Sequence, residues 1–369
     1  MNRFLILAIA CITTALGAKA DSLTVHRIEA DIVPSGVMHT NRYLRGHNPD
    51  GKSINMALMA RLKYALQTSG DPEAVAAYQG VGLGYLRNGH LLGNPVEAFL
   101  FQGAPIVRLS PQLTLNYELQ FGGSFGWRHV GSELAENHVL GSRANFYIGT
   151  DLYLSWQLSQ QWDLNVGGSY IHFSNANLQM PNEGLNDIGL RVSAAYYPNR
   201  TERASQTTLV SARTLPKAER WTTDVLVYGG WKKKSHLRTD NFGVAGFSVS
   251  PTYHLNEAVA IGPALDGVYD RSINIPDLAD LSPEDPSANE QMALGVQARA
   301  ELTLPLLRAS AGAGYYVLGG FHAFYETIAM KADLCDWLFL HVGYCLYNYK
   351  YSNNLMLGIG CRLGKHHRQ

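Results

Sequence analysis

Hydrophobic and polar residues alternate with a period of two along much of this chain. From Trp162 to Tyr170 the even-numbered positions carry mostly large apolar residues, and the odd-numbered positions carry Asp, Asn, Gly and Ser. The segment from Asn186 to Tyr196 continues the pattern, again with apolar residues at even numbers. Because successive side chains of a β-strand point to opposite sides, this period predicts strands with one apolar and one polar face. We therefore expect an all-β, antiparallel fold.

The connections between these predicted strands alternate between short and long. Bacterial outer-membrane barrels have this rhythm, with short periplasmic turns and long outer loops. It predicts a transmembrane β-barrel, and a coarse count gives roughly 12–16 strands, with about sixteen preferred. The short connections lie at Leu109–Gln112, Ser159–Gln161, His254–Glu257 and Leu304–Leu306, and the long ones at residues 128–142, 176–185 and 271–290.

Composition supports a membrane barrel over a soluble β-sandwich. Hydrophobic residues make up 46% of the chain, which also contains 20 Tyr and 36 Gly. Beyond the N-terminus, no continuous apolar run is long enough for a membrane helix. The frequent tyrosines are typical of the aromatic girdles of outer-membrane barrels. In a soluble sandwich the apolar face would instead form the core, and we consider that alternative less favoured.

The N-terminus predicts export. Residues 1–20 contain an early Arg3, a short apolar core and Ala18-Lys19-Ala20, which fits a signal-peptidase site. Cys11 raises the alternative of a lipoprotein, but Ala8 stands where such signals prefer leucine. We expect a signal peptide cleaved near Ala20 and a mature protein in the outer membrane.

A polar connection divides the strands into two sets of about eight. Residues 199–220 form a long segment where a short periplasmic turn is expected. The predicted organisation is a first barrel half at 21–199, a polar connector at 200–221 and a second half at 222–369. We prefer one wide barrel completed by the second half, because two apposed barrels would need an interface within the membrane. Two eight-stranded units in tandem are the alternative.

Charge and cysteines exclude some functions. The net charge is zero and 16% of residues are charged, which argues against a nucleic-acid partner. After signal cleavage Cys335, Cys345 and Cys361 remain. Cys345 and Cys361 fall on opposite faces of neighbouring predicted strands, so a disulfide between them is not expected. Free, buried thiols are the preferred interpretation.

Three polar residues occupy positions on an apolar face. His172 and Ser174 are two residues apart on one strand and share the even-numbered, lipid-facing side. The turn composition at residues 181–184 would bring Asn186, in phase with the apolar face of the next strand, close to His172. Polar side chains facing lipid are costly unless they lie at the interface or serve a function.

This arrangement is suited to ester hydrolysis. His172 would act as general base and Ser174 as nucleophile, with a third group holding the imidazole. Main-chain amides near Asn175 and Ala176, or the Asn175 side chain, would stabilise the oxyanion. Glu183 and Asp187 are the nearby acids, but both fall in the opposite phase.

The same segment resembles the signature of the outer-membrane lipid A 3-O-deacylase (PagL-like, acyloxyacyl hydrolase) family. The resemblance rests on His172-Phe-Ser-Asn-Ala176, Pro181-Asn182 and Gly184-Leu-Asn186. It implies an eight-stranded barrel with a Ser–His–acid triad on its exterior, acting without a metal or other cofactor. It assigns the base to His172, the nucleophile to Ser174 and part of the oxyanion hole to Asn175. The family's acid, a glutamate in its best-known form, falls on Asn186.

The sequence therefore predicts an outer-membrane carboxylic ester hydrolase that removes an ester-linked acyl chain from lipid A or lipopolysaccharide. Asn186 is a departure, because an amide can orient a histidine but cannot stabilise imidazolium by charge. A second alternative is a non-enzymatic barrel, porin-like or structural, that retains a degenerate motif. Homodimer formation is left open.

Overall fold

The computed structural model describes residues 24–68, 75–129, 137–200, 207–234, 240–275, 286–303, 307–348 and 351–364. Sixteen β-strands and two short 3₁₀ segments, Lys217–Glu219 and Ala288–Gln291, are its regular elements. Within these ranges no helix has the length and apolar character needed to cross a membrane. The expected signal peptide, residues 1–20, lies outside the described residues.

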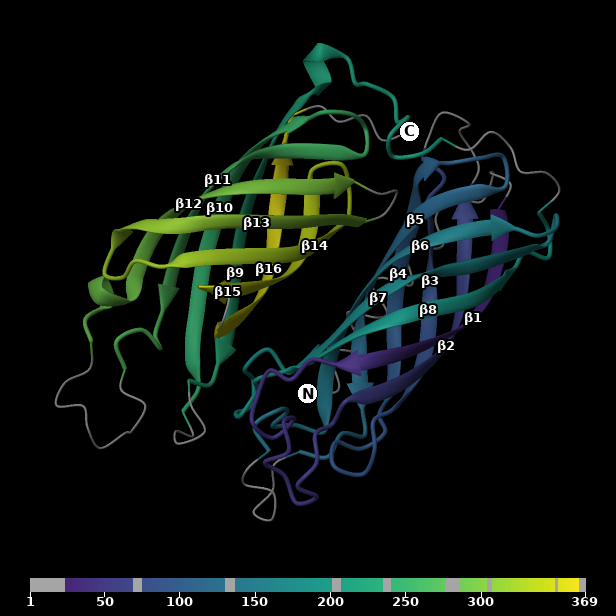
Figure 1. Ribbon diagram of the computed structural model, residues 1–369. Coiled ribbons are helices and arrows are strands. Elements are labelled where there is room, and N and C mark those ends of the chain that lie inside the picture. The colour runs from purple at the N-terminus through teal and green to yellow at the C-terminus, as the bar shows by residue number, and fades with distance from the viewer. Residues whose placement is uncertain are drawn as a thin grey trace. The chain divides into compact units, whose positions relative to one another are not determined.

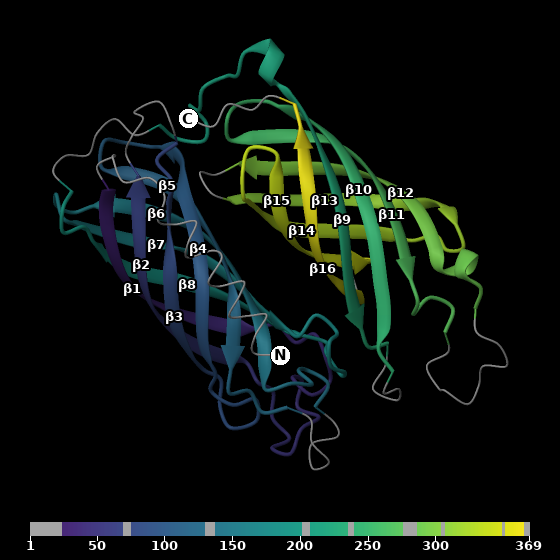
Figure 2. The ribbon, with the colours of Figure 1, turned by 180° about the vertical axis from the view of Figure 1, so that it is seen from behind.

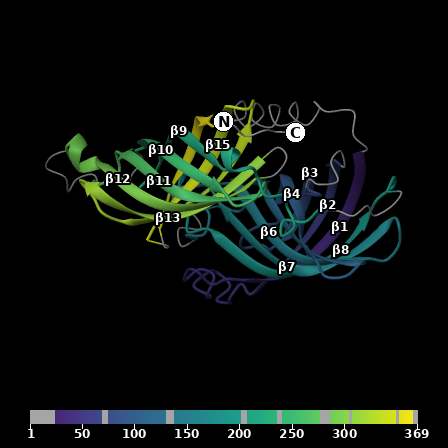
Figure 3. The same cartoon turned by 90° about the horizontal axis from the view of Figure 1, so that it is seen from above.

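The first eight strands form a closed antiparallel barrel (Figure 1). Each strand pairs with the next, and β8 returns to pair with β1, from Ile28 opposite Tyr196 to Val37 opposite Asp187. Figure 3 shows β8 beside β1. The strands are β1 (Thr24–Val37), β2 (Met56–Thr68), β3 (Tyr78–Arg87), β4 (Val96–Arg108), β5 (Leu113–Phe125), β6 (Ala144–Gln157), β7 (Trp162–Ser174) and β8 (Leu185–Tyr196).

The other eight strands form a second closed barrel (Figure 2). Here β16 pairs with β9, from Leu357 opposite Gly229 to Leu363 opposite Thr223. The strands are β9 (Trp221–Lys232), β10 (Phe242–His254), β11 (Val259–Asp270), β12 (Met292–Thr303), β13 (Leu307–Gly319), β14 (Phe324–Asp333), β15 (Leu338–Tyr347) and β16 (Tyr351–Leu363).

The predicted all-β antiparallel barrel fold is confirmed, but the preference for one wide barrel is wrong. The chain divides into compact units at Leu23–Ala212 and Arg213–Gln369, each with its own closed sheet. The physical reason is that β8 satisfies the open edge of β1, so no backbone edge remains for the second half to complete. The alternative of two eight-stranded units is the organisation observed.

The alternation of the sequence sets the two faces of each strand. On β7, Trp162, Val166 and Tyr170 are exposed, whereas Asp163, Asn165 and Ser169 are buried. The predicted connection rhythm is also present: four residues join β4 to β5 and eighteen join β5 to β6. We call the end of each barrel that carries the long connections its outer end.

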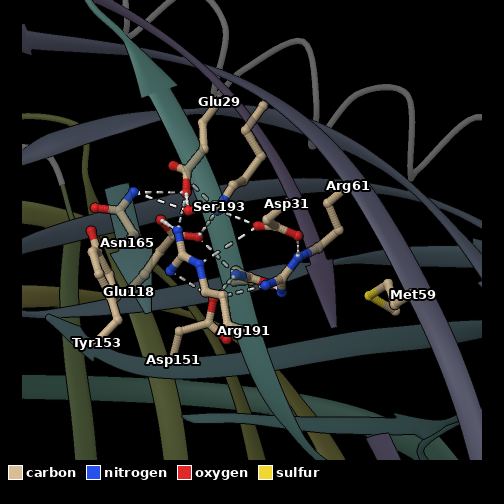
Figure 4. A network of polar contacts seen from close by, with 12 residues as sticks. Glu29, Asp31, Met59, Arg61, Glu118, Asp151, Tyr153, Asn165, Arg191 and Ser193 are labelled. Carbon is tan, nitrogen blue, oxygen red and sulfur yellow. Dashed lines mark hydrogen bonds and ion pairs between the residues drawn. The ribbon is translucent and has the colours of Figure 1, made fainter. Parts of the chain in front are cut away.

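Charged side chains fill the lumen of the first barrel (Figure 4). Arg61 donates to Asp31 at 2.6 Å and to Asp151 at 3.0 Å. Arg191 bonds Asp151 at 3.0 Å and also contacts Glu29. These side chains are at most 1% exposed. Lys63 and Glu118, 2.8 Å apart, belong to the same network. An eight-stranded barrel has room only for such side chains.

The second barrel has its own luminal ion cluster. Arg308 donates to Asp224 at 2.6 Å, and Lys331 lies 2.5 Å from Glu301. Arg362 joins them through Asp224 at 3.0 Å. The two barrels therefore share one construction, with apolar residues outside and buried ion pairs inside.

An apolar cluster closes the outer end of the first barrel. Three outer loops contribute buried residues to it, and these pack with Phe173 of β7 and Leu185 of β8. The Trp127 ring, for example, lies 4.8 Å from that of Phe173. The loop residues are Tyr43, Leu44, Leu91, Leu92, Trp127, Val139 and Leu140. This packing holds the loops against the ends of β7 and β8.

The cysteines behave partly as expected. No disulfide joins the described cysteines, and Cys345 lies on the buried face of β15 while Cys361 lies on the half-buried outer face of β16. Opposite faces forbid that bridge, as the alternation predicts. Cys335 is exposed, so the expectation of buried thiols is wrong for this residue, which lies in the β14–β15 turn.

Candidate functional site

The site residues lie where β7 and β8 reach the outer end of the first barrel. His172 shares the outward row of Tyr170 and is half-buried, and Ser174, the last residue of β7, is only 6% exposed. Between the described residues no hydrogen bond joins His172 to Ser174, although they are neighbours in one row. Catalytic hydrogen bonds of this kind are often long in ligand-free enzymes and tighten with substrate.

Asn186 lies directly across the hairpin from His172. The two residues are register partners of β7 and β8. Asn186 Oδ1 lies 2.6 Å from His172 Nδ1. A carboxamide oxygen only accepts, so Nδ1 carries the hydrogen and donates to it, and in the neutral ring Nε2 is left as the acceptor. This is the tautomer that a histidine needs to accept a serine proton.

A second donor reaches the same amide oxygen. Tyr170 lies two residues before His172 in the outward row of β7, and its hydroxyl donates to Asn186 Oδ1 at 2.7 Å. Asn186 therefore accepts two hydrogen bonds on one oxygen, both from the exterior of β7.

The loop after β7 is held by polar side chains. The Asn175 N–H donates to Asn182 Oδ1 at 2.9 Å, and the Asn175 side-chain amide donates to Ser142 Oγ at 3.2 Å. The main-chain amide of Asn175 is therefore already hydrogen-bonded within the loop and is not free to bind an oxyanion. Ala176 adopts a positive φ of 56° and is 2% exposed. Among the described residues no hydrogen bond from its N–H is found. Of the two main-chain amides considered for an oxyanion hole, the one at Ala176 is the one left open.

Gly184 brings the loop back against His172. Its φ is +75°, and a Cβ at this position would lie 3.0 Å from His172 Cε1. Its N–H donates to Val139 O at 3.0 Å, and the neighbouring Glu183 N–H donates to His138 O at 3.1 Å. A glycine here therefore meets both the left-handed backbone and the close approach of the imidazole.

The two nearby acids do not approach the histidine. Asp187 points into the lumen and is fully buried, whereas Glu183 is exposed in the loop. Within the described residues no carboxylate forms an ion pair or hydrogen bond with His172. Asn186 thus occupies the third position alone. In the same ranges, no three His, Cys, Asp or Glu side chains gather as metal ligands would.

Four residues that contact the site were not predicted from the sequence to take part in it: Tyr170, Ser142, Asn182 and Gly184. Tyr170 could have been predicted from the sequence, because it lies two residues before His172 and therefore on the same face of the strand. Asn182 and Gly184 lie inside the signature, but their contacts depend on loop geometry that alternation does not specify. Ser142 comes from another loop, and no local pattern pointed to it.

Family models match both halves of the chain. Residues 57–195 match the model described as lipid A 3-O-deacylase (PagL), and residues 221–366 match the model described as acyloxyacyl hydrolase, C-terminal domain. Together these matches cover most of the chain. No curated protein matches.

The solved structures that align with this chain include an outer-membrane channel and a porin. An outer-membrane channel from Pseudomonas putida F1 aligns over 94% of this chain and 97% of its own, with 11% identity and a TM-score of 0.21. A BenF-like porin from Pseudomonas fluorescens Pf-5 aligns over 94% and 98%, with 9% identity and a TM-score of 0.22. TM-scores this low support no conclusion about the fold or the function of this chain.

The two family matches span both barrels, and the first contains the complete His172, Ser174 and Asn186 constellation. The chain belongs to the lipid A 3-O-deacylase and acyloxyacyl hydrolase family of the outer membrane.

Proposed function

We propose that the first barrel is a serine esterase that hydrolyses an ester-linked acyl chain of lipid A or lipopolysaccharide. The observation that carries this proposal is the 2.6 Å contact between His172 Nδ1 and Asn186 Oδ1 on the barrel exterior. It orients a histidine for base catalysis two residues before a serine in the same outward row of β7, on the face that meets lipid. The family match supports the substrate class.

The first half of the reaction forms an acyl-enzyme. Ser174 Oγ attacks the ester carbonyl carbon while His172 Nε2 takes the hydroxyl proton. The tetrahedral intermediate collapses, the bond from the carbonyl carbon to the sugar oxygen breaks, and the imidazolium returns the proton to that oxygen. The lipid then leaves with a free hydroxyl group, and the acyl chain stays on Ser174.

The second half regenerates the serine. Water attacks the acyl-enzyme carbonyl, and His172 Nε2 takes one of its protons. Collapse of this intermediate breaks the bond to Ser174 Oγ, which receives the proton from His172. The product is a free fatty acid, and neither half requires a cofactor.

Two groups could donate hydrogen bonds to the negative charge that develops on the ester carbonyl oxygen. The Ala176 N–H, for which no hydrogen bond is found among the described residues, follows Ser174 by two positions and would donate to the oxyanion. The second hydrogen of the Asn175 side-chain amide is another candidate donor, because Ser142 uses only one. Asn186 holds the ring through a neutral hydrogen bond.

The alternative of a porin-like barrel is less well supported. A channel needs an open lumen, whereas the described lumen of each barrel is crossed by ion pairs whose side chains are largely sealed from solvent. Homodimer formation stays a prediction.

The test is mass spectrometry of lipid A from cells that express the full chain. We expect the wild type to remove one acyl mass and Ser174→Ala to leave lipid A unchanged. Ser169→Ala is the matched control, because Ser169 lies on the same strand but faces the lumen; this variant should act as the wild type does. Folding is checked by the heat-dependent gel shift of the barrels. Retained activity in Ser174→Ala would exclude Ser174 as nucleophile, and unchanged lipid A with folded wild type would reject the proposed function.

A further inference from the structure

The hydrogen bond of Tyr170 to Asn186 has no role in the reaction scheme above. The Tyr170 hydroxyl donates to Asn186 Oδ1 at 2.7 Å, and His172 Nδ1 lies 2.6 Å from the same oxygen. The three residues occupy one outward-facing patch, two of them on β7 and one on β8. Tyr170 is 41% exposed, so its ring does not belong to the packed interior.

An amide in the third position raises an orientation problem that a carboxylate does not have. Both oxygens of a carboxylate accept hydrogen bonds, so either orientation holds the Nδ1–H of a histidine. A carboxamide has one acceptor and one donor end. If its NH₂ group faced the ring, Nδ1 would have to accept, the hydrogen would move to Nε2, and the base would be lost.

Tyr170 favours the productive orientation. A phenol donates a hydrogen bond more readily than it accepts one, because its oxygen lone pair is delocalised into the ring. The carbonyl end of Asn186 therefore pairs with the Tyr170 hydroxyl better than the NH₂ end would. The same orientation presents the oxygen to His172.

We propose that Tyr170 is a positioning residue that fixes the Asn186 amide with its oxygen toward His172 and so selects the catalytic tautomer. The inference rests on the proposed function and applies to this chain because the third position carries an amide. Tyr170 has no direct contact with the reacting ester in this scheme. Its removal should therefore lower kcat and leave KM nearly unchanged.

The kinetic test is a double-mutant cycle on purified full-length protein in detergent micelles with lipid A. We expect Tyr170→Phe to lower kcat about three- to tenfold, the usual effect of losing one hydrogen bond. In the Asn186→Glu background the same change should lower kcat less than about twofold, because a carboxylate needs no orienting. Equal losses in both backgrounds, or a loss that appears in KM, would overturn the proposal.

Tyr64→Phe is the matched control. Tyr64 is also 41% exposed on the exterior of the first barrel, and its hydroxyl lies 2.6 Å from His26 Nδ1. Tyr64→Phe therefore also removes a hydrogen bond between an exterior tyrosine and a polar side chain, but at a position away from the site. A loss in Tyr64→Phe as large as that in Tyr170→Phe would count against a specific role.

A readout without activity separates this inference from the proposed function. The ¹⁵N chemical shifts of His172, assigned with a His172→Gln variant, report which ring nitrogen carries the hydrogen. We expect the Nδ1–H tautomer in the wild type and a mixture with the Nε2–H form in Tyr170→Phe. An unchanged tautomer in Tyr170→Phe would overturn the inference, even if acyl release were confirmed. The expected shift would support it even if lipid A proved to be the wrong substrate.

Discussion

In the proposed triad, the residue at position 186 determines how far charge can stabilise the protonated histidine. Asn186 presents its oxygen to His172 at 2.6 Å, so it holds the ring in the tautomer that accepts a proton from serine. What it lacks is the negative charge that would stabilise the imidazolium. The large losses seen when a triad acid becomes an amide arise from the wrong tautomer. This chain is therefore expected to keep most of the orienting effect and to lose only the charge.

We predict that Asn186→Glu raises kcat for acyl release roughly five- to tenfold. A charged hydrogen bond is worth about 1 kcal/mol more than a neutral one, which corresponds to this factor. Asn186→Leu should lower kcat by at least the same factor, because it removes the acceptor. Both are measured as initial rates of fatty-acid release in micelles. A lower rate in Asn186→Glu, with the barrel folded, would show that the amide is required for more than orientation.

The positions of His172, Ser174 and Asn186 on the outward face could be predicted from parity alone. The loop contacts could not. The use of the Asn175 amide by Asn182 depends on two consecutive residues, Ala176 and Asn177, with positive φ, which no alternation pattern encodes. The oxyanion role of Asn175 and Ala176 stays a proposal, and the bond to Asn182 leaves Ala176 as the main-chain donor we favour.

At the scale of elements, the β7–β8 hairpin brings the site together. Its register pairs His172 with Asn186, and the loop between the strands is tied back onto the preceding outer loop through Val139 and His138. A single slip of one residue would move the whole constellation into the lumen. The buried Phe173 and Leu185, which are also register partners, oppose such a slip.

We predict that Gly184→Ala lowers kcat by tenfold or more without unfolding the barrel. The added Cβ would lie 3.0 Å from His172 Cε1 and would occupy a φ of +75° that costs an L-residue about 1 kcal/mol. Small displacements of a catalytic group are costly in rate. Gly168→Ala is the control, because Gly168 lies on the same strand as His172 and a Cβ added there would meet no heavy atom within 4 Å. Equal rates in the two variants would show that the ring tolerates the contact.

At the scale of the molecule, closure into two barrels could not be read from the alternation. One barrel of sixteen strands and two of eight present the same lipid-facing and lumen-facing rows, and differ only in which strands pair at the edges. That pairing joins β1 to β8, from Val37 and Asp187, 150 positions apart, to Ile28 and Tyr196, 168 positions apart. The polar connector near residue 200 was one local indication of two barrels. The charged residues at lumen-facing positions were another, because a narrow barrel must fill its lumen with side chains.

The luminal network is expected to contribute strongly to stability. Arg191 forms ion pairs with both Glu29 and Asp151, so Arg191→Met would remove one partner from each carboxylate. Breaking a buried ion pair costs about 3–5 kcal/mol. We predict this loss in the free energy of unfolding of the first barrel, measured by urea titration in micelles. Arg45 is exposed, and among the described contacts its side chain bonds only the His39 carbonyl oxygen, so Arg45→Met should change this free energy by less than about 0.5 kcal/mol. A small loss in Arg191→Met would mean that Lys63 and Arg61 compensate.

The outward-facing row of β7 has a consequence for how this protein meets its substrate. An enzyme whose reactive side chains face the acyl phase samples substrate in two dimensions, by lateral diffusion, and not from bulk water. Its rate then follows the mole fraction of substrate in the surrounding leaflet. Diluting that leaflet with inert lipid would slow the reaction at constant total substrate, whereas adding more vesicles of the same composition would not.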